Sequence, residues 1–388
     1  MMSFNPSFSD KGVSNDDPKV RVIVVDDSLV IRGFITRALS HEAGFDVVGT
    51  AANGKAAIDV LARTPADVVI LDIEMPVMDG LTAIPKLKEI DPAVQIIMAS
   101  TLTQKNAEIS MKALSLGATD YLPKPSAREM AVPNAFLHDL REKVKTLGIR
   151  AWRNNVRKTP FRKTVVADAA PVEKKAFSLR AMTPHFKPEI IAIGSSTGGP
   201  QALFSVIRAM GKELLQPVVI TQHMPPSFTT ILASHIAREC GVSCEEAKEG
   251  MPLQPGHYYV APGDFHLLVT KKLSGPMVEL AQTPAENYCR PAVDPMLRSL
   301  VGVYGSRILV VILTGMGQDG MKGSEDVVRA GGAVLAQNEA TSVVWGMPGA
   351  VAMAGLCSAV LPVGEIGPVV KRIAIQGGAG SMGDGSRA

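Results

Sequence analysis

The sequence has few cysteines, and their placement excludes two common kinds of site. Only four occur in 388 residues, none of them forms a C-x-x-C pair, and no further histidine or cysteine at metal-ligand spacing accompanies Cys240 and Cys244. This spacing predicts neither a disulfide-stabilised fold nor a zinc centre. We expect reduced thiols at Cys240, Cys244, Cys289 and Cys357.

Long apolar runs and an excess of one charge are also lacking. No run approaches transmembrane length, and the first residues, MMSFNPSFSDKGVSNDDPK, do not contain the apolar core of a signal peptide. The 40 Lys and Arg against 37 Asp and Glu leave a formal charge of +3, too small to favour nucleic acid or membrane binding by the whole chain. We therefore expect a cytoplasmic protein with no membrane insertion.

The length and composition are those of a globular protein with two domains. Hydrophobic residues make up 46% of the chain and charged residues 20%, as in ordinary soluble proteins, and 388 residues are enough for two cores. We predict a disordered N-terminus over residues 1–19, a first domain over 20–148, a flexible basic linker over 149–188, a second domain over 189–375, and a disordered tail over 376–388.

Apolar segments alternate with amphipathic ones throughout residues 20–148. The strand-like runs are VRVIVVDD, DVVGTA, DVVILDI, QIIMAS and DYLPKP, and helical patterns lie between them. This alternation, with short connections, predicts five βα units and a parallel sheet covered on both faces by helices. Ligands bind at the carboxyl ends of the strands in such folds, so polar residues there are candidates for function.

Three acidic side chains stand at two of these strand ends. Asp26 and Asp27 follow the first strand, and Asp72 ends the third. Carboxylates that converge in this way repel one another unless a cation is bound, and oxygen ligands of this kind favour Mg²⁺. The sequence therefore predicts a divalent metal site at this edge of the sheet.

Hydroxyl and ammonium groups follow at the next two strand ends. Ser100 and Thr101 come directly after QIIMA, and Lys124 precedes Pro125. Acid, hydroxyl and lysine together make a phosphoryl-transfer site, in which metal and lysine neutralise phosphate charge around an attacked carboxylate. Each residue alone is more commonly a solvated side chain or a helix cap. Their occurrence at successive strand ends favours function.

Four segments, VVDDS, ILDIEMPVMDG, the hydroxyl pair after the fourth strand and DYLPKP, make residues 20–148 resemble a flavodoxin-like response-regulator receiver domain. The segment STLTQKN is slightly longer than in the simplest receivers, which leaves the start of the fourth helix open. The resemblance implies phosphorylation by a histidine kinase, with Asp72 as phosphoacceptor, Asp26, Asp27 and Asp72 at Mg²⁺, Ser100 (alternatively Thr101) and Lys124 at the phosphate, and Tyr121 as the switch aromatic.

The predicted linker is basic and rich in proline. Between Ala151 and Pro188 nine lysines and arginines face two acids, and four prolines interrupt any helix. A tether of this length lets the first domain dock over the second and leave again without dissociating. Recognition of nucleic acid or an acidic surface by this segment is the less favoured alternative.

The second domain opens with EIIAIGSSTGGP. The isoleucines suit a buried strand, and the glycines and Pro200 suit a tight turn that opens a helix. Ser196 would then follow the strand and face the unpaired N–H groups of that helix, and the segment fits the G-x-S-x-G pattern of a nucleophile elbow. A turn without chemistry and a phosphate-binding turn are the alternatives.

A histidine and an aspartate stand at two later strand ends. PVVITQH predicts a buried strand that ends at His223, and RILVVILTGMGQDG predicts a strand that leads into glycines and Asp319. A neutral histidine takes the serine proton as the hydroxyl attacks a carbonyl, while the carboxylate orients the imidazole. In α/β-hydrolases the acid precedes the histidine, so the order found here predicts a different fold.

The alternation of strand-like and helical patterns over residues 189–375 predicts a doubly wound, mainly parallel α/β fold for this domain. Residues 245–269 and 276–282 carry β-type alternation and turn signals, which favour inserted hairpins. Further strands and helices follow to about residue 375.

Six motifs connect this domain with a known family: IGSSTGGP, ITQHMPPSF, YVAPGDFH, NYCRPAVDPM, ILTGMGQDG and AQNEATSVVWGMPGA. With the receiver ahead of them, they make the chain resemble the chemotaxis response regulator protein-glutamate methylesterases, many of which are also protein-glutamine deamidases. Gln318 departs from the asparagine that many members have. The resemblance implies Ser196 as nucleophile, His223 as base, Asp319 as its orienter, and Thr197, Gly198 and Met316 around the oxyanion.

The implied activity is removal of methyl esters from glutamate side chains of chemoreceptors, with deamidation of glutamines as a further reaction. It needs no cofactor for the esterase chemistry, and phosphorylation of Asp72 would uncover Ser196. The implied partners are a chemotaxis histidine kinase and methyl-accepting chemoreceptors, with no nucleic acid, and we expect a monomer. The alternative is a non-catalytic signalling adaptor that binds a nucleotide or protein at the glycine-rich turn. A DNA-binding regulator ranks last, because no helix-turn-helix pattern follows the linker.

Overall fold

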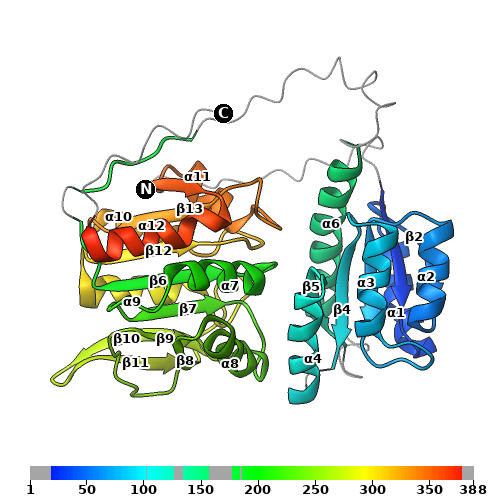
Figure 1. Ribbon diagram of the computed structural model, residues 1–388, viewed down its shortest axis with the longest axis horizontal. Coiled ribbons are helices and arrows are strands. Elements are labelled where there is room, and N and C mark those ends of the chain that lie inside the picture. The colour runs from blue at the N-terminus through cyan, green and yellow to red at the C-terminus, as the bar shows by residue number, and fades with distance from the viewer. Residues whose placement is uncertain (1–18, 102, 126–133, 157–176, 184–185, 378–388) are drawn as a thin grey trace, which may run out of the picture. The chain divides into compact units, whose positions relative to one another are not determined.

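The computed structural model describes residues 19–101, 103–125, 134–156, 177–183 and 186–377. The predicted disordered segments lie almost wholly outside these residues, as does most of the predicted linker, so their disorder and flexibility stay predictions. Figure 1 shows two sets of strands and helices that follow one another along the chain. Within the described part of the chain, the helices are too short or too polar to span a bilayer.

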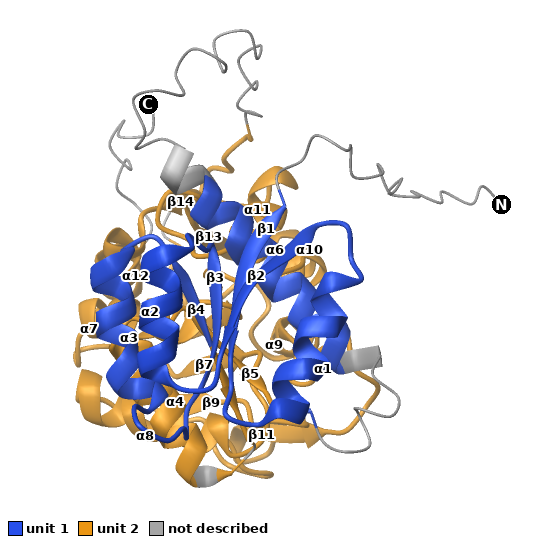
Figure 2. Ribbon diagram, turned by 90° about the vertical axis from the view of Figure 1, so that its right-hand side faces the viewer, with its two compact units in different colours: residues 1–97, 125–160 blue, residues 98–124, 161–388 orange. Residues whose placement is uncertain are grey.

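The chain forms two compact units, drawn in different colours in Figure 2: residues 1–97 with 125–160, and residues 98–124 with 161–388. This division does not coincide with the predicted domains, because residues 98–124 group with the later part of the chain. The domain boundaries given above therefore stay predictions.

The first sheet has the order β2-β1-β3-β4-β5, and β1 pairs parallel with both β2 and β3. This is the flavodoxin-like order, with its switch point between β1 and β3, and it confirms the predicted fold of the first domain. Its strands are β1 (Val20–Val25), β2 (Phe45–Ala51), β3 (Val68–Asp72), β4 (Gln95–Ser100) and β5 (Asp120–Pro123), and its helices are α1 (Leu29–Ser40), α2 (Gly54–Arg63), α3 (Gly80–Ile90), α4 (Gln104–Ser115) and α6 (Asn134–Val156).

Capping residues fix where four of these helices begin. The side chains of Ser28, Asn53, Asp79 and Thr103 each accept a hydrogen bond from the backbone N–H three residues later, at 3.4, 2.9, 2.7 and 3.2 Å. Such caps satisfy N–H groups that the first turn leaves without a partner. The Thr103 cap settles the start of the fourth helix at Gln104, which the longer STLTQKN segment left open.

Helix α6 extends eight residues past Gly148, where the predicted linker begins. The low helix propensity of glycine predicts a helix end at Gly148. In the structure, Gly148 is instead required by close packing against β1. A Cβ atom at Gly148 would lie 2.1 Å from a methyl carbon of Val20, so the helix and the start of β1 approach too closely for any other residue. The helix therefore continues through the glycine to Val156.

The second sheet has seven strands in the order β14-β13-β12-β6-β7-β9-β8, and every adjacent pair is parallel. All residues of the central strands β6, β7, β12 and β13 are buried, as expected for strands covered on both faces. The strands are β6 (Ile190–Ser195), β7 (Val218–Gln222), β8 (Ser243–Glu246), β9 (His257–Val260), β12 (Ile308–Ile312), β13 (Ala333–Gln337) and β14 (Ala359–Leu361).

The hairpin prediction is confirmed for one part of its range and not for another. β10 (His266–Lys272) and β11 (Gly275–Ala281) form an antiparallel pair outside the main sheet. β8 and β9 instead pair parallel at the edge of the main sheet. β8 is the edge strand and alternates between exposed and half-buried residues, whereas β9 lies between β7 and β8 and is mostly buried. A local pattern does not distinguish such a pair from a hairpin.

The helices of the second sheet lie on both of its sides, as Figure 1 shows. α7 packs against α8 and α12, while α9 packs against α10 and against β10 of the hairpin. These helices are α7 (Gly199–Met210), α8 (Phe228–Cys240), α9 (Val293–Tyr304), α10 (Met321–Arg329), α11 (Met347–Met353) and α12 (Val363–Gln376). α12 ends one residue beyond the predicted domain boundary at residue 375.

Candidate active site and phosphoacceptor site

The second sheet reverses its strand order between β6 and β12, and three predicted site residues follow strands at or next to this point. Ser196 follows β6, His223 follows the neighbouring strand β7, and Asp319 lies in the loop between β12 and α10. Ligands bind at such switch points in doubly wound sheets. The register Ser195–Gln222 and a hydrogen bond from the His223 N–H to the Ser195 carbonyl, 3.1 Å, place Ser196 and His223 on adjacent strand ends.

His223 and Asp319 form a close pair. The distance from His223 Nε2 to Asp319 Oδ2 is 2.7 Å, and the aspartate side chain is 1% exposed. Burial disfavours the charged carboxylate, but the hydrogen bond and charge of His223, with backbone N–H groups of Val293 and Asp294, outweigh it and hold the pKa of Asp319 below its ordinary value. Asp319 is therefore a carboxylate positioned to hold an imidazole.

Backbone N–H groups at the starts of α9 and α10 supply further partners of Asp319. The N–H groups of Val293 and Asp294 donate to it at 2.6 and 3.1 Å, and the N–H of Gly320 donates at 2.9 Å. Hydrogen bonds from backbone N–H groups at a helix start favour an anion. They fix the carboxylate on the side of His223.

Asn287 is a site residue that the sequence interpretation did not identify. Its amide donates to Asp319 Oδ1 at 3.0 Å and to Asp294 Oδ2 at 3.1 Å, so it links two buried acids. Burial and the charge of Asp319 raise the pKa of Asp294, which also accepts from the Gly323 N–H. The signal was present in NYCRPAVD, whose asparagine and aspartate flank a predicted helix start, but a helix cap explains the aspartate equally well.

Replacing Asn287 by glycine removes these two bonds without backbone strain, because Asn287 has φ 50°, in the left-handed region that glycine adopts freely. Hydrogen bonds to charged groups contribute about 1.5–3 kcal/mol, so we expect Asn287→Gly to lower kcat by roughly tenfold for the ester hydrolysis that the family resemblance implies. Methanol release measures this effect. Asn287→Ala is the companion variant and should lose stability in addition, seen in urea unfolding. A glycine variant with wild-type kcat would show that Asn287 does not position Asp319.

The other ring nitrogen of His223 faces a thiol. Cys289 Sγ lies 3.3 Å from His223 Nδ1. Burial of the ring lowers the pKa of His223, but Cys289 and Asp319 together outweigh this and raise it to about 10. The Ser196 hydroxyl makes no hydrogen bond to any residue that the structure describes. The structure therefore brings His223 and Asp319 together, and places Ser196 on the adjacent strand end without a hydrogen bond to His223.

Close backbone packing positions Ser196. Its N–H donates to the Thr314 carbonyl at 3.0 Å, and a Cβ atom at Gly315 would lie 3.0 Å from both the Ser196 N and Cβ atoms. Gly198, which caps α7, has φ 74°, and a Cβ there would lie 2.5 Å from Val343. Both glycines are therefore required by the shape of the site.

Backbone N–H groups are available beside Ser196. Among the described residues, the N–H groups of Thr197 and Gly198 donate to none. Two such N–H groups at the start of a helix can stabilise a developing oxyanion. Met316 lies in the loop after β12, next to Gly315.

The first sheet brings its three predicted acids together. One carboxylate oxygen from each of Asp26, Asp27 and Asp72 lies within 4.8 Å of the others. Asp26 and Asp72 are buried, and the Ser28 and Ile73 N–H groups donate to them at 2.9 and 2.7 Å. Three oxygen donors at this spacing fit a hard divalent cation such as Mg²⁺.

The remaining predicted phosphate contacts lie at the ends of the next two strands. Ser100 ends β4 and is 1% exposed, with its hydroxyl donating to the Thr101 carbonyl at 3.1 Å. Thr101 is exposed, and its hydroxyl accepts from Asn106 at 2.6 Å. The Lys124 N–H donates to the Ser100 carbonyl at 2.7 Å, and Tyr121 is buried in β5.

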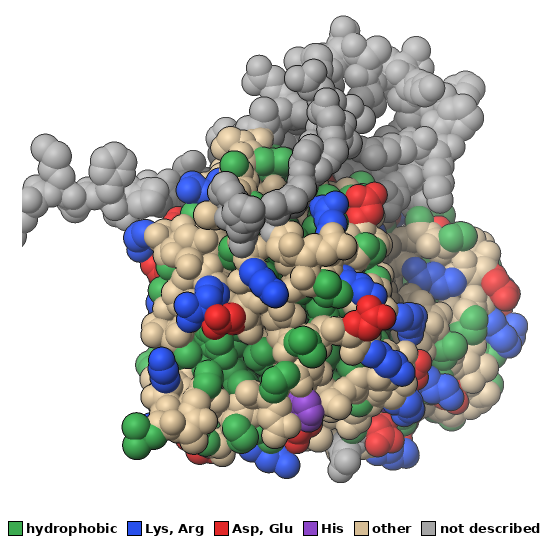
Figure 3. Space-filling model, turned by 60° about the vertical axis from the view of Figure 1, so that its left-hand side comes forward, with side chains coloured by type: hydrophobic (Ala, Val, Ile, Leu, Met, Phe, Trp, Pro, Cys, Tyr) green, Lys and Arg blue, Asp and Glu red, His purple; other side chains and the backbone are tan. Residues whose placement is uncertain are grey.

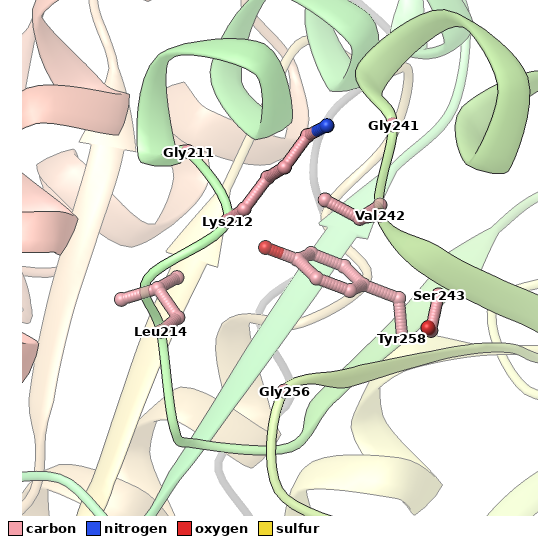
Figure 4. A pocket seen from close by; sticks show the side chains of 8 residues that line it. All are labelled: Gly211, Lys212, Leu214, Gly241, Val242, Ser243, Gly256 and Tyr258. Carbon is pink, nitrogen blue, oxygen red and sulfur yellow. The ribbon is translucent and has the colours of Figure 1, made fainter.

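A cavity in the second unit is separate from all these residues. Its volume is about 160 Å³, and it lies at the ends of α7 and α8 beside Tyr258, as Figure 4 shows. It is lined by Gly211, Lys212, Leu214, Gly241, Val242, Ser243, Gly256 and Tyr258. None of these is a predicted site residue, so this cavity is not the candidate active site.

Both halves of the chain point to one class of protein, a response regulator whose output domain is a hydrolase. Comparison with known proteins gives the family. Residues 191–370 match the CheB methylesterase family, and residues 22–132 match the response regulator receiver domain. Relatives named protein-glutamate methylesterase/protein-glutamine glutaminase are more than half identical to this chain over nearly its whole length. The chain therefore belongs to this family.

Two relatives and one solved structure illustrate the similarity. The protein-glutamate methylesterase/protein-glutamine glutaminase of group 2 operon from Rhodospirillum centenum is 54% identical, over 94% of this chain and 96% of that protein. The protein-glutamate methylesterase/protein-glutamine glutaminase of Azospirillum brasilense is 53% identical, over 95% and 96%. The crystal structure of the Thermotoga maritima CheB methylesterase catalytic domain is 40% identical, covering 48% of this chain and 99% of that one, with a TM-score of 0.47.

Proposed function

We propose that the second domain hydrolyses γ-glutamyl methyl esters of chemoreceptors by attack of Ser196, under the control of phosphorylation at Asp72. Membership of the methylesterase family supports the reaction class and disfavours the non-catalytic adaptor. The observation that carries the assignment of residues is the 2.7 Å pair of His223 and Asp319 on the strand ends beside Ser196.

The chemistry follows from the two ring nitrogens of His223. Because Nε2 is held by Asp319, Nδ1 is the nitrogen that accepts the Ser196 proton as Oγ attacks the ester carbonyl. The new C–O bond creates an oxyanion that the N–H groups of Thr197 and Gly198 stabilise. The protonated imidazole then donates to the leaving methoxide, which departs as methanol and leaves an acyl-serine.

Water completes the reaction. His223 removes a proton from water, the hydroxide attacks the acyl carbon, and Ser196 leaves with the proton that His223 returns. The products are the glutamate carboxylate and the free enzyme. Glutamine deamidation uses the same steps with ammonia as leaving group, and is slower because an amide nitrogen must be protonated before it departs.

In the receiver, Asp72 accepts a phosphoryl group from a chemotaxis histidine kinase. Asp26, Asp27 and Asp72 would hold Mg²⁺, which supplies positive charge against the phosphate oxygens when bound. Ser100 and Lys124 contact the phosphoryl group in this proposal, and Tyr121 responds to it. Thr101, which accepts a hydrogen bond from Asn106, stays the alternative hydroxyl.

The proposed partners and setting follow from the same function. The kinase and the methyl-accepting receptors are the expected partners, the protein acts in the cytoplasm as a monomer, and it binds no nucleic acid. On the face that Figure 3 shows, lysines and arginines are interspersed with aspartates and glutamates. This distribution, with the small net charge of +3, supports protein partners over a nucleic acid backbone.

Asp72→Asn should abolish stimulation by a phosphodonor. The measurement is methanol release from methylated receptor membranes with and without acetyl phosphate and Mg²⁺. We expect the wild type to be stimulated about 5- to 150-fold, the range of a typical coupling free energy, and to lose this stimulation in EDTA. The Asp72→Asn variant should show none.

Asp59→Asn is the matched control, because Asp59 is an exposed aspartate of helix α2, beside the same sheet, that pairs only with Lys55 among the described residues. It should be stimulated like the wild type. Undiminished stimulation of the Asp72→Asn variant would contradict the phosphoacceptor assignment, and absence of methanol release from the stimulated wild type would contradict the proposed reaction.

A further inference from the structure

Cys289 differs from the other three cysteines in its surroundings. Burial raises the pKa of the Cys244 and Cys357 thiols, in each case to about 12, and the Cys240 thiol donates to the Phe204 carbonyl at 3.7 Å. Cys289 is partly exposed, and its sulfur lies 3.3 Å from a ring nitrogen of His223. Among the four thiols it alone is paired with an imidazole in the described structure.

The His223–Asp319 pair acts on this thiol as it would on a serine. With Nε2 donating to Asp319, Nδ1 is the proton acceptor, and the Cys289 S–H is the group that faces it. Proton transfer gives a thiolate beside an imidazolium, which the Asp319 carboxylate stabilises. Cys289, His223 and Asp319 thus form a second set of nucleophile, base and orienting acid, beside Ser196.

The loop that carries Cys289 is held on both sides. Asn287 is bonded to Asp294 and Asp319, and the Arg290 guanidinium donates to the Asp264 carboxylate at 2.6 and 3.1 Å. The thiol therefore stays against the base. It is also within reach of solutes, because it is partly exposed.

We propose that Cys289 is a site of reversible thiol modification by small disulfides, and that its modification switches the esterase off. The inference rests on the proposed role of His223 as base. In the step, the Cys289 thiolate attacks one sulfur of the small disulfide, a new S–S bond forms, the old S–S bond breaks, and the second half leaves as a thiolate that takes up a proton.

Loss of activity follows from the position of the adduct. The substituent is attached 3.3 Å from the nitrogen that must accept the Ser196 proton, so it occupies the space that the ester and the serine hydroxyl need. A thiol reductant reverses the exchange and restores the site. The esterase is in this way sensitive to the thiol–disulfide balance of its surroundings without any change in Asp72.

The test uses the full chain and oxidised glutathione as the probe. Methanol release and the mass of the Cys289 peptide are followed together, before and after dithiothreitol. We expect activity to fall in step with a single adduct at Cys289, and to return with dithiothreitol. Cys289→Ala and Cys289→Ser should both lose this inhibition, so that their rates with and without the disulfide agree.

Cys240→Ala is the matched control, because Cys240 is another partly exposed thiol but lacks an imidazole partner. It should remain as sensitive as the wild type. His223→Ala should slow adduct formation at Cys289 by about tenfold, since the thiol loses the imidazole nitrogen, 3.3 Å away, that accepts its proton. This readout is a mass and does not depend on esterase activity.

Three results would overturn the proposal: adducts at Cys240 as fast as at Cys289, inhibition that persists in both Cys289 variants, or a complete Cys289 adduct with full methanol release. Failure of the proposed function looks different. In that case adduct formation at Cys289 still depends on His223, while Ser196→Ala continues to release methanol.

Discussion

Ser196→Ala should reduce methanol release by about 10⁴- to 10⁶-fold, the loss found when the nucleophile of a serine hydrolase is removed. The neighbouring Ser195 does not replace it, since Ser195 is buried and its hydroxyl donates to Gln222 at 2.7 Å. Without Oγ no acyl intermediate forms, and the site retains only oxyanion stabilisation and substrate binding.

The same variant should fold normally. The Ser196 hydroxyl has no partner among the described residues, so its removal leaves no buried group unsatisfied, and the backbone bond from its N–H to Thr314 remains. We expect a change in the free energy of unfolding within about 0.5 kcal/mol. Phosphorylation at Asp72 should also persist, which separates a chemical defect from a folding defect.

Ser234→Ala provides the comparison, because Ser234 is an exposed serine of α8 whose hydroxyl donates only to the Thr230 carbonyl. It should release methanol at the wild-type rate. If Ser196→Ala stayed within tenfold of the wild type, Ser196 would not be the nucleophile. Loss of activity in Cys289→Ala instead would assign that role to the thiol that the structure places at His223 Nδ1.

The sequence could predict most of the fold because the strands that decide it are buried on both faces. Runs such as IIAIGS and ILVVI have no solvated side. Strand order was harder, since the segments around β8 and β9 carry turn signals like those of the true hairpin β10–β11, although β8 and β9 pair parallel. The pattern predicts the end of helix α6 too early, at Gly148. The helix continues through this glycine, which is needed because a Cβ atom there would clash with Val20.

The site was predictable as far as strand ends define it. Ser196, His223 and Asp319 follow β6, β7 and β12, and parallel strands bring their carboxyl ends to one edge. Asn287 and Cys289 come from a loop between the hairpin and α9, and no period relates them to the strands. Their contacts with Asp319 and His223 depend on the path of that loop, which side-chain identity alone does not determine.

Asp319→Asn should have the second large effect, a fall in kcat of about 10⁴-fold, as when the triad aspartate of chymotrypsin is changed to asparagine. Asp319 accepts from His223, Val293, Asp294, Gly320 and Asn287. An amide has one acceptor oxygen in place of two. If its NH₂ faces Nε2, the ring must carry its proton on Nδ1, the nitrogen that has to accept the Ser196 proton.

The same change should shift the pH profile. His223 acts as a base only when neutral, and in the wild type Cys289 and Asp319 raise its pKa above the ordinary 6.5, to about 10. Wild-type activity should therefore climb with pH well beyond 6.5. Removing the negative charge of Asp319 lowers the pKa of His223, so the residual activity of Asp319→Asn should reach its half-maximum at a lower pH. If Asp319→Asn reached half-maximal activity at the wild-type pH or at a higher pH, the charge of Asp319 would not raise the pKa of His223.

Asp294→Asn is the control that separates the orientation of His223 by Asp319 from the effect of removing any buried carboxylate of this network. Asp294 is also 1% exposed and also binds Asn287, but it does not contact His223, and burial raises its pKa while the pKa of Asp319 is lowered. Both variants should lose about 1–3 kcal/mol of stability, because buried N–H donors lose an acceptor. Only Asp319→Asn should lose 10⁴-fold in kcat, since only its carboxylate fixes the proton of the base. Equal kcat losses in the two variants would mean that the network supports the fold of the site and that Asp319 does not orient His223.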